Sequence, residues 1–177
     1  TLTVSDITAG TVTIAGIETL NLVSAGSANA LTALTTANAT TLNVSGDQTI
    51  SLGTLGTTVT TINAAAATAA VTAAATNTVG AAVTGGSAGD TLTGVGGNDT
   101  LSGGAGNDTI TTGAGNDTVL GGLGNDTFSM LGNLTAADTV TGGDGVDTLT
   151  VNSSITAANA ANVTGVENIN FVNTALT

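Results

Sequence analysis

A nine-residue spacing of aspartates constrains the fold of this chain more than any other feature. Five aspartates recur at this spacing, each within a glycine-rich stretch: Asp90, Asp99, Asp108, Asp117 and Asp126. Two of the stretches, residues 103–111 and 121–129, read Gly-Gly-x-Gly-Asn-Asp-Thr-U-x, where U is a large apolar residue. So short a unit cannot bury an apolar face alone and must stack on its neighbours. The spacing therefore predicts a solenoid.

Each unit reads as a six-residue glycine turn followed by a three-residue strand. Glycine at the first, second and fourth positions permits positive φ and close backbone approach. In an extended strand the U side chain points inward, while the flanking threonines point outward. The U residues are Leu92, Leu101, Ile110, Val119, Phe128, Val140 and Leu149. Two units make a coil of 18 residues, so alternate units stack in parallel as a β-roll.

The repeat array covers residues 85–150 and contains one interruption. After Phe128 three residues are inserted, and residues 133–141 keep only the Asp138-Thr-Val-Thr end of the unit. Residues 142–150 then restore the full pattern. The degenerate unit therefore keeps the aspartate but lacks the glycine turn of the other units.

Residues 1–84 have a related but longer period. Short alternating segments recur, and a Thr-hydrophobe-Asn element begins at Thr19, Thr41 and Thr61, spaced by 22 and 20 residues. Alternation indicates strands, so this segment is predicted to be a Thr/Ala-rich β-solenoid with slightly larger coils. Residues 27–39 and 64–76 are ambiguous, because alanine favours a helix and threonine opposes it. Continued solenoid or loop is the favoured interpretation for the alanine-rich stretch.

The two ends of the chain resemble each other. Residues 1–4 and 16–22 reappear as residues 148–151 and 165–171. One interpretation is a tandem array of longer modules, in which residues 151–177 start the next solenoid module. The other is coincidence between two threonine-rich segments.

The charge of the chain narrows the possible partners. It contains 12 acidic residues and no Lys, Arg or His, so its formal net charge is −12 and its carboxylates must be solvated, protonated or bound to metal. Nucleic acid and anionic membranes are poor partners without basic residues. No apolar run is long enough for a membrane-spanning helix, and no His, Lys, Cys or Tyr could serve as base or nucleophile, so we expect no membrane insertion and no enzymatic activity.

The aspartate spacing predicts several calcium ions between coils. Calcium takes about six to eight oxygen ligands, both carboxylates and backbone carbonyls, whereas magnesium prefers regular octahedra with retained water. Stacking of alternate units pairs Asp90 with Asp108, Asp99 with Asp117, and Asp108 with Asp126. The alternative is a metal-free ladder of solvated turns, since Asp and Asn favour turns in general. The acidic residues outside the repeats are expected at the surface: Asp6, Glu18, Asp47 and Glu167.

Residues 85–150 resemble the RTX, or hemolysin-type, calcium-binding repeats. The whole chain, with its Thr/Ala-rich solenoid and Gly-Ile/Val-Glu elements, resembles calcium-dependent S-layer proteins of Gram-negative bacteria. The resemblance implies type I export, a location at the cell surface, and calcium ligands from repeat aspartates and turn carbonyls. The implied ligands are Asp90, Asp99, Asp108, Asp117, Asp126, Asp144, Asp147, Gly103, Ala105, Gly106, Asn107, Gly121, Leu123, Gly124 and Asn125.

The expected function is a structural, calcium-stabilised module of a secreted surface layer that self-assembles. Its expected partners are copies of itself, with a cell-surface polysaccharide as a further candidate. One alternative is an RTX adhesin or ice-binding module that uses outward threonines such as Thr11 and Thr13. Another is the accessory β-roll of a type I-secreted enzyme or toxin.

Overall fold

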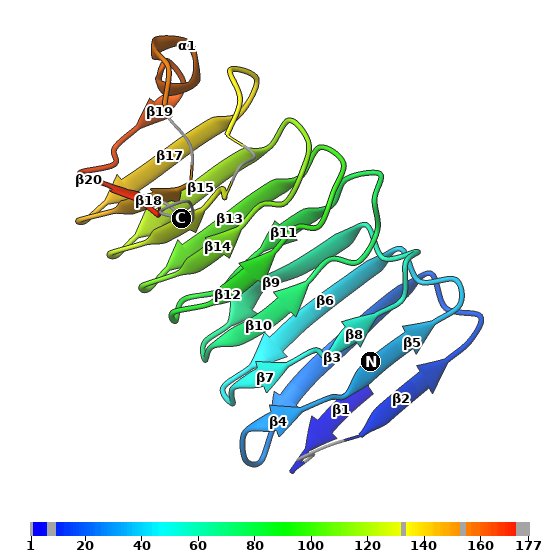
Figure 1. Cartoon of the computed structure of the whole chain (residues 1–177). Helices are drawn as coiled ribbons and strands as arrows, with labels where there is room; N and C mark the ends of the chain where they lie inside the picture. The colour runs from blue at the N-terminus through cyan, green and yellow to red at the C-terminus, as the bar shows by residue number, and fades with distance from the viewer. Residues whose placement is uncertain (1, 7–9, 132–133, 153–154, 173–177) are drawn as a thin grey trace.

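The chain forms an elongated parallel β-solenoid whose coils stack along one axis (Figure 1). The computed structural model describes residues 2–6, 10–131, 134–152 and 155–172. Two sheets run along the molecule, and all strand pairs in them are parallel. This architecture confirms the predicted all-β solenoid that continues into a roll.

The nine-stranded sheet contains, in spatial order, β1 (Leu2–Ser5), β3 (Thr19–Ala25), β6 (Thr41–Gly46), β9 (Thr61–Ala67), β11 (Ala82–Thr84), β13 (Thr100–Ala105), β15 (Thr118–Leu123), β17 (Thr139–Asp144) and β19 (Val163–Thr164). The eight-stranded sheet contains β4 (Asn29–Ala30), β7 (Ile50–Ser51), β10 (Val71–Ala74), β12 (Thr91–Thr93), β14 (Thr109–Thr111), β16 (Thr127–Ser129), β18 (Thr148–Val151) and β20 (Asn168–Phe171).

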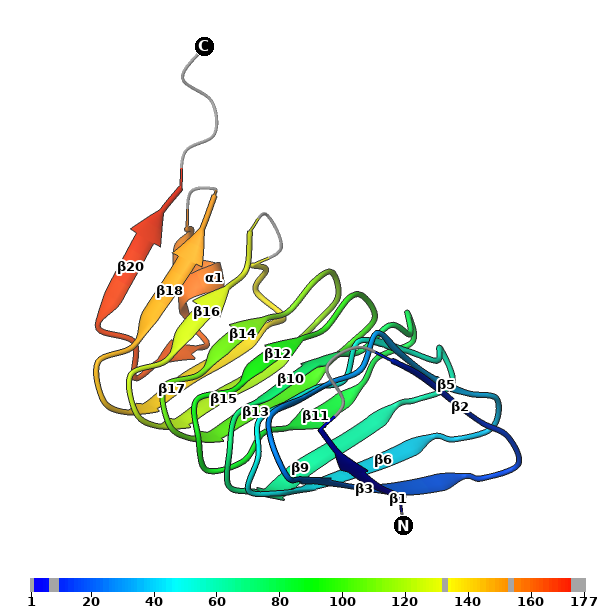
Figure 2. The ribbon, with the colours of Figure 1, turned by 90° about the horizontal axis from the view of Figure 1, so that it is seen from below.

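A third sheet widens the N-terminal coils. It contains β2 (Thr11–Ile14), β5 (Ala33–Thr36) and β8 (Thr54–Leu55), which line an additional side of the solenoid (Figure 2). Thr19, Thr41 and Thr61 are aligned across β3, β6 and β9, as their spacing predicts. In the roll, Thr100 pairs with Thr118, one 18-residue coil later. The N-terminal coils are longer because they hold this additional strand.

Both ambiguous stretches are strands. Residues 27–39 contain β4 and β5, and residues 64–76 contain the end of β9 and all of β10. Ala64, Ala67 and Ala73 are buried, so their small side chains fill a narrow part of the core. Pairing of β9 with β6 and β11 outweighs the helix propensity of alanine.

The core is one continuous cluster of buried apolar side chains, to which the strands of all three sheets contribute. All seven U residues of the repeats are at most 1% exposed, as predicted. The threonine that precedes each of them points outward, because successive side chains in a strand alternate.

The glycine segments differ between the two edges of the roll. β12, β14 and β16 are three-residue strands as predicted, but β13, β15 and β17 have six residues and include turn glycines. Gly104, Gly122 and Gly143 pair in register across these strands. A side chain at Gly122 would collide with the Gly104 carbonyl, so only glycine allows this close backbone stacking. The prediction of a pure six-residue turn was wrong for these units.

A single helical turn, α1 (Ala157–Ala160), lies between β18 and β19 and begins at the N-cap Thr156. The side-chain amide of Asn159 donates to the Leu134 carbonyl at 2.9 Å and ties this turn to the preceding coil. Within the described ranges, no helix is long and apolar enough to cross a membrane. The recurring ends of the chain lie in different sheets: β1 pairs with β3 in one, and β18 with β20 in the other.

Candidate metal centre

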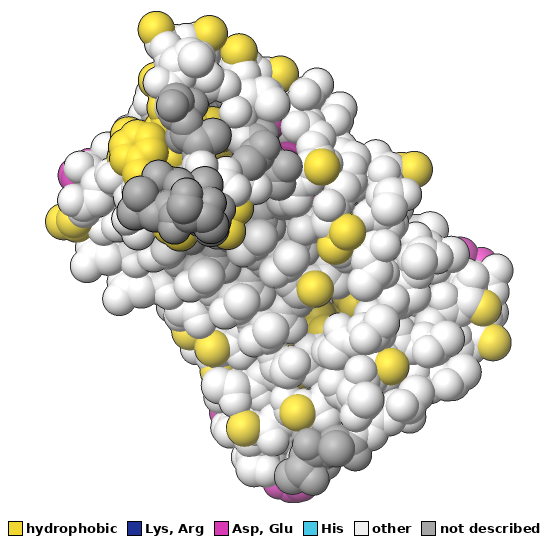
Figure 3. All heavy atoms as spheres, viewed as in Figure 1, with side chains coloured by type: hydrophobic (Ala, Val, Ile, Leu, Met, Phe, Trp, Pro, Cys, Tyr) yellow, Lys and Arg dark blue, Asp and Glu magenta, His cyan; other side chains and the backbone are white. Residues whose placement is uncertain are grey.

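Seven aspartates of the repeat region are buried, each at most 2% exposed: Asp90, Asp99, Asp108, Asp117, Asp126, Asp138 and Asp147. Each lies two residues before a buried U residue, so strand alternation turns both side chains to the same inward side. Acidic side chains are accordingly scarce on the face shown in Figure 3. The carboxylates are therefore part of the interior.

The buried aspartates form two rows. Row one contains Asp90, Asp108, Asp126 and Asp147, and row two contains Asp99, Asp117 and Asp138. One carboxylate oxygen of each later member accepts a hydrogen bond from the backbone N–H of the member one coil earlier. The N–H to oxygen distances in row one are 2.7 Å to Asp108, 2.8 Å to Asp126 and 2.7 Å to Asp147. In row two they are 2.9 Å to Asp117 and 2.7 Å to Asp138. The predicted stacking pairs are thus neighbours.

The second carboxylate oxygen is buried and unpartnered in four of these residues. Across the part of the chain that the structure describes, the Oδ2 atoms of Asp99, Asp108, Asp126 and Asp147 accept no hydrogen bond. Leaving such an atom unsatisfied is costly, and more so when it carries charge.

Each unpartnered oxygen lies so close to a glycine of its own turn that a Cβ there would collide with it. A Cβ added at Gly103 would meet Oδ2 of Asp108 and the Gly121 carbonyl of the next coil. The same pair of oxygens meets at three further glycines, Gly94, Gly121 and Gly142. A carboxylate oxygen and a carbonyl oxygen therefore converge at each position. This donor set fits a hard cation that prefers oxygen, and calcium in particular.

The repeats match a known family. Residues 84–119, 93–128 and 135–153 match the RTX calcium-binding nonapeptide repeat, described in blocks of four copies. This segment is an RTX β-roll. RTX repeats with stacked aspartate rows imply calcium binding. The matched residues are well under half of the chain, and neither a curated protein nor a solved structure is significantly similar to it.

Backbone oxygens must supply much of any coordination shell in the RTX roll. In the described ranges, no group of three or more carboxylate, His or Cys side chains could hold a metal ion by itself. The carbonyls of Gly103 and Gly121 are predicted ligands that face a row-one carboxylate oxygen. The Leu123 carbonyl instead accepts the N–H of Gly106 at 2.8 Å.

The remaining predicted carbonyl ligands lie in the outer parts of the glycine turns: Ala105, Gly106, Asn107, Gly124 and Asn125. The Asn107 side chain accepts the Asn125 N–H at 2.8 Å, so these asparagines link successive turns. Asp144 is exposed and lies outside both rows, with its carbonyl accepting the Gly124 N–H. Ligand roles for all six residues stay predictions.

Two acidic residues that belong to the rows are absent from the ligands predicted from the sequence. Asp138 is fully buried and belongs to row two, although its unit lacks glycines. The surviving Asp-Thr-Val-Thr end was the signal for it, because this end keeps the inward alternation. Glu167 is exposed, as expected, but its Oε2 accepts the Asp147 N–H at 2.7 Å and so extends row one. Gly132 and Asn133, at the interruption, lie outside the described residues.

Some carboxylates in the rows are already satisfied by the backbone. Asp90 accepts from the N–H groups of Val71 and Gly86, one on each oxygen. Asp138 likewise accepts from Asp117 and Thr135. Both oxygens of Asp90 and of Asp138 therefore have backbone partners, whereas Asp99, Asp108, Asp126 and Asp147 each keep one oxygen for a cation.

Burial raises the pKa of Asp108 to about 7; the hydrogen bond from Asp90 lowers it, and the charges of Asp126 and Asp90 raise it further. Burial is also the largest cause of the raised pKa values of Asp90, Asp99, Asp117 and Asp126. No basic side chain offsets this effect. Without metal, these carboxyl groups hold protons more tightly in the folded protein than in the unfolded chain.

These shifts predict a pH dependence of the metal-free protein. Between the ordinary pKa of 3.8 and about 7, the folded state binds more protons than the unfolded state, so the free energy of unfolding falls as pH rises. In chelator, the roll should be more stable at pH 5 than at pH 7.5, where we expect it to unfold, and β-sheet circular dichroism as a function of pH measures the difference. Calcium should reverse this order, because it binds the deprotonated carboxylates. Equal stability at both pH values in chelator would contradict the prediction.

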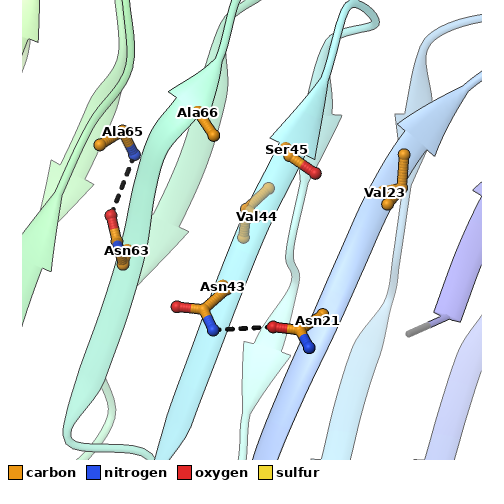
Figure 4. A pocket seen from close by; sticks show the side chains of 8 residues that line it. All are labelled: Asn21, Val23, Asn43, Val44, Ser45, Asn63, Ala65 and Ala66. Carbon is orange, nitrogen blue, oxygen red and sulfur yellow. Dashed lines mark hydrogen bonds between the residues drawn. The ribbon is translucent and has the colours of Figure 1, made fainter.

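The outer face of the nine-stranded sheet carries a shallow hollow of about 490 Å³ (Figure 4). Asn21, Asn43 and Asn63 line it together with small side chains, and the Asn43 amide donates to Asn21 at 2.8 Å. Asn63 instead accepts the Ala65 N–H, where the pairing of β6 with β9 shifts register. No ionisable side chain lines the hollow, so it lacks acid–base groups.

Proposed function

We propose that this chain is a structural, calcium-stabilised module of a secreted cell-surface layer, and that it assembles with copies of itself. The proposed calcium dependence rests on the two buried rows, because the chain has no basic side chain to neutralise their unpartnered oxygens. RTX repeats are typical of type I-secreted extracellular proteins, which supports a location where calcium is abundant. We also propose that the module has no catalytic role, because the aspartates of the rows are buried and bonded to the backbone of neighbouring coils.

The observation that carries the assembly proposal is an exposed apolar surface on the last described coil, at the β20 end of the rod. Ile169, Phe171 and Val172 are 46%, 58% and 38% exposed, on or next to the edge strand β20. Figure 3 shows hydrophobic side chains gathered at this end. An apolar surface beside an open strand edge favours association, and no Lys or Pro in the chain blocks pairing there. In the proposed assembly, the end of a second rod covers this surface and continues the parallel sheets.

Light scattering of the protein at millimolar calcium and in chelator tests this proposal. Assemblies should form only with calcium, and Phe171→Asn should reduce their mass. Val79→Asn is the matched control, because Val79 is 79% exposed but lies in the loop between β10 and β11, away from the end strand. A strict monomer at millimolar calcium would overturn self-assembly and favour the accessory roll of a secreted enzyme or toxin. Electron microscopy of the assemblies would distinguish a layer from filaments.

The threonine face of the eight-stranded sheet supports the adhesin or ice-binding alternative. Thr91, Thr109, Thr127 and Thr148 are aligned on successive parallel strands, one coil apart. In β2, Thr11 pairs with Ala33, so the row that starts at Thr11 is interrupted, whereas Thr13 pairs with Thr35 in β5. Measurement of ice affinity or of ligand-dependent adhesion by the monomer would favour this alternative over assembly.

A further inference from the structure

Row one continues beyond the RTX repeats. Asp147 is its last aspartate, and the matched repeats end at residue 153. The next coil supplies Glu167, whose Oε2 accepts the Asp147 N–H at 2.7 Å. This is the bond that the carboxylate of Asp126 makes with the Asp108 N–H at 2.8 Å. Glu167 thus takes the place of an aspartate in a coil that has no nonapeptide pattern.

The same pair of oxygens meets beside Asp147 as at the equivalent glycines within the repeats. Asp147 is fully buried, and its Oδ2 has no hydrogen-bond partner among the described residues. A Cβ at Gly142 would meet this Oδ2 and the Gly165 carbonyl, just as one at Gly121 would meet Oδ2 of Asp126 and the Gly142 carbonyl. Gly165 has φ +60°, a conformation that favours glycine. The non-repeat coil therefore presents its carbonyl where the repeats present theirs.

The negative charge of the carboxylates at this end of row one also favours a bound cation. Asp147 and Glu167 are consecutive carboxylates in the row, and the chain has no basic side chain to place between them. Glu167 has one more methylene than aspartate, and its exposed position leaves its second oxygen accessible. A calcium ion here would take three protein oxygens and complete its shell with further carbonyls and water.

We propose that Asp147, the Gly165 carbonyl and Glu167 form a calcium site at the end of row one. Asp147 belongs to the RTX repeats, whereas Gly165 and Glu167 lie beyond them. The site therefore joins the roll to the coil that contains β19 and β20. This inference rests on calcium binding by the rows. It adds a residue, Glu167, that no nonapeptide pattern would select.

Native mass spectrometry of the calcium-loaded protein tests the site. Glu167→Gln removes the charge but keeps an oxygen that can accept the Asp147 N–H, so the coil should stay folded. We expect this variant to bind one fewer calcium ion than the wild type. Glu18→Gln is the matched control, because Glu18 occurs in the similar segment Gly16-Ile-Glu18 and is also exposed, but it follows no row of aspartates. The control should retain every ion.

The outcomes separate this site from calcium binding in general. A wild type that binds no calcium would overturn the calcium assignment of both rows. A wild type that binds calcium, with an unchanged ion count in Glu167→Gln, would overturn only the terminal site. A lower melting temperature with an unchanged ion count would show that Glu167 positions the coil and is not a ligand, which also overturns the proposal.

Discussion

Removal of calcium should unfold the RTX roll and leave the N-terminal solenoid folded. The unpartnered carboxylate oxygens all lie between Asp99 and Asp147 among the described residues. The coils from β3 to β10 are held by apolar side chains and contain no such row. Asp90, at the junction, is satisfied by the N–H groups of Val71 and Gly86. Binding that occurs only in the folded state stabilises it, so the roll should depend on calcium and the solenoid should not.

Hydrogen exchange with excess chelator measures this difference along the chain. Amide protection should be lost in β13–β18 and kept in β3, β6 and β9, with a matching partial loss of β-sheet circular dichroism. Calcium should restore the roll with a midpoint of roughly 10⁻⁴ to 10⁻³ M, as is usual for extracellular modules. Magnesium at the same concentration is the control and should not restore it. Unchanged protection of the roll in chelator would refute the calcium dependence.

Asp108→Ala should be among the most destabilising single changes in calcium. Its carboxylate bonds to the Asp90 backbone, its Oδ2 faces the Gly121 carbonyl, and it lies between two other charged members of the row. The substitution removes an oxygen ligand and leaves the neighbouring charges less compensated. Loss of one partner from a buried charged site costs roughly 3–5 kcal/mol, and we expect a loss in that range.

Asp47→Ala is the control for Asp108→Ala. Asp47 is exposed and accepts a hydrogen bond from the Gln48 side-chain amide at 3.2 Å, so its replacement should change stability by about 0.5 kcal/mol or less. Urea denaturation at saturating calcium, together with the calcium stoichiometry of each variant, makes the comparison. Equal stability and equal stoichiometry of the two variants would show that Asp108 is not a ligand.

The repeat spacing determined the roll because it is a local and periodic signal. Once Asp108 and Asp126 are 18 residues apart and each precedes an inward U residue, parallel stacking follows from strand geometry. The absence of every basic residue also determined, from composition alone, that buried carboxylates could not form an ion pair with a side chain of the chain. The same periodicity placed the N-terminal coils, since Thr19, Thr41 and Thr61 keep their spacing in the sheet.

Only the tertiary structure decided which carboxylate oxygens are satisfied. Asp90 and Asp108 have nearly the same local sequence, but the backbone of the preceding coil and of its own turn saturates only Asp90. The tertiary structure also decided that Asp138 and Glu167 belong to the rows, because each accepts a hydrogen bond from the backbone N–H of an aspartate one coil earlier. These contacts join residues 18 to 21 positions apart, so no local pattern contains them.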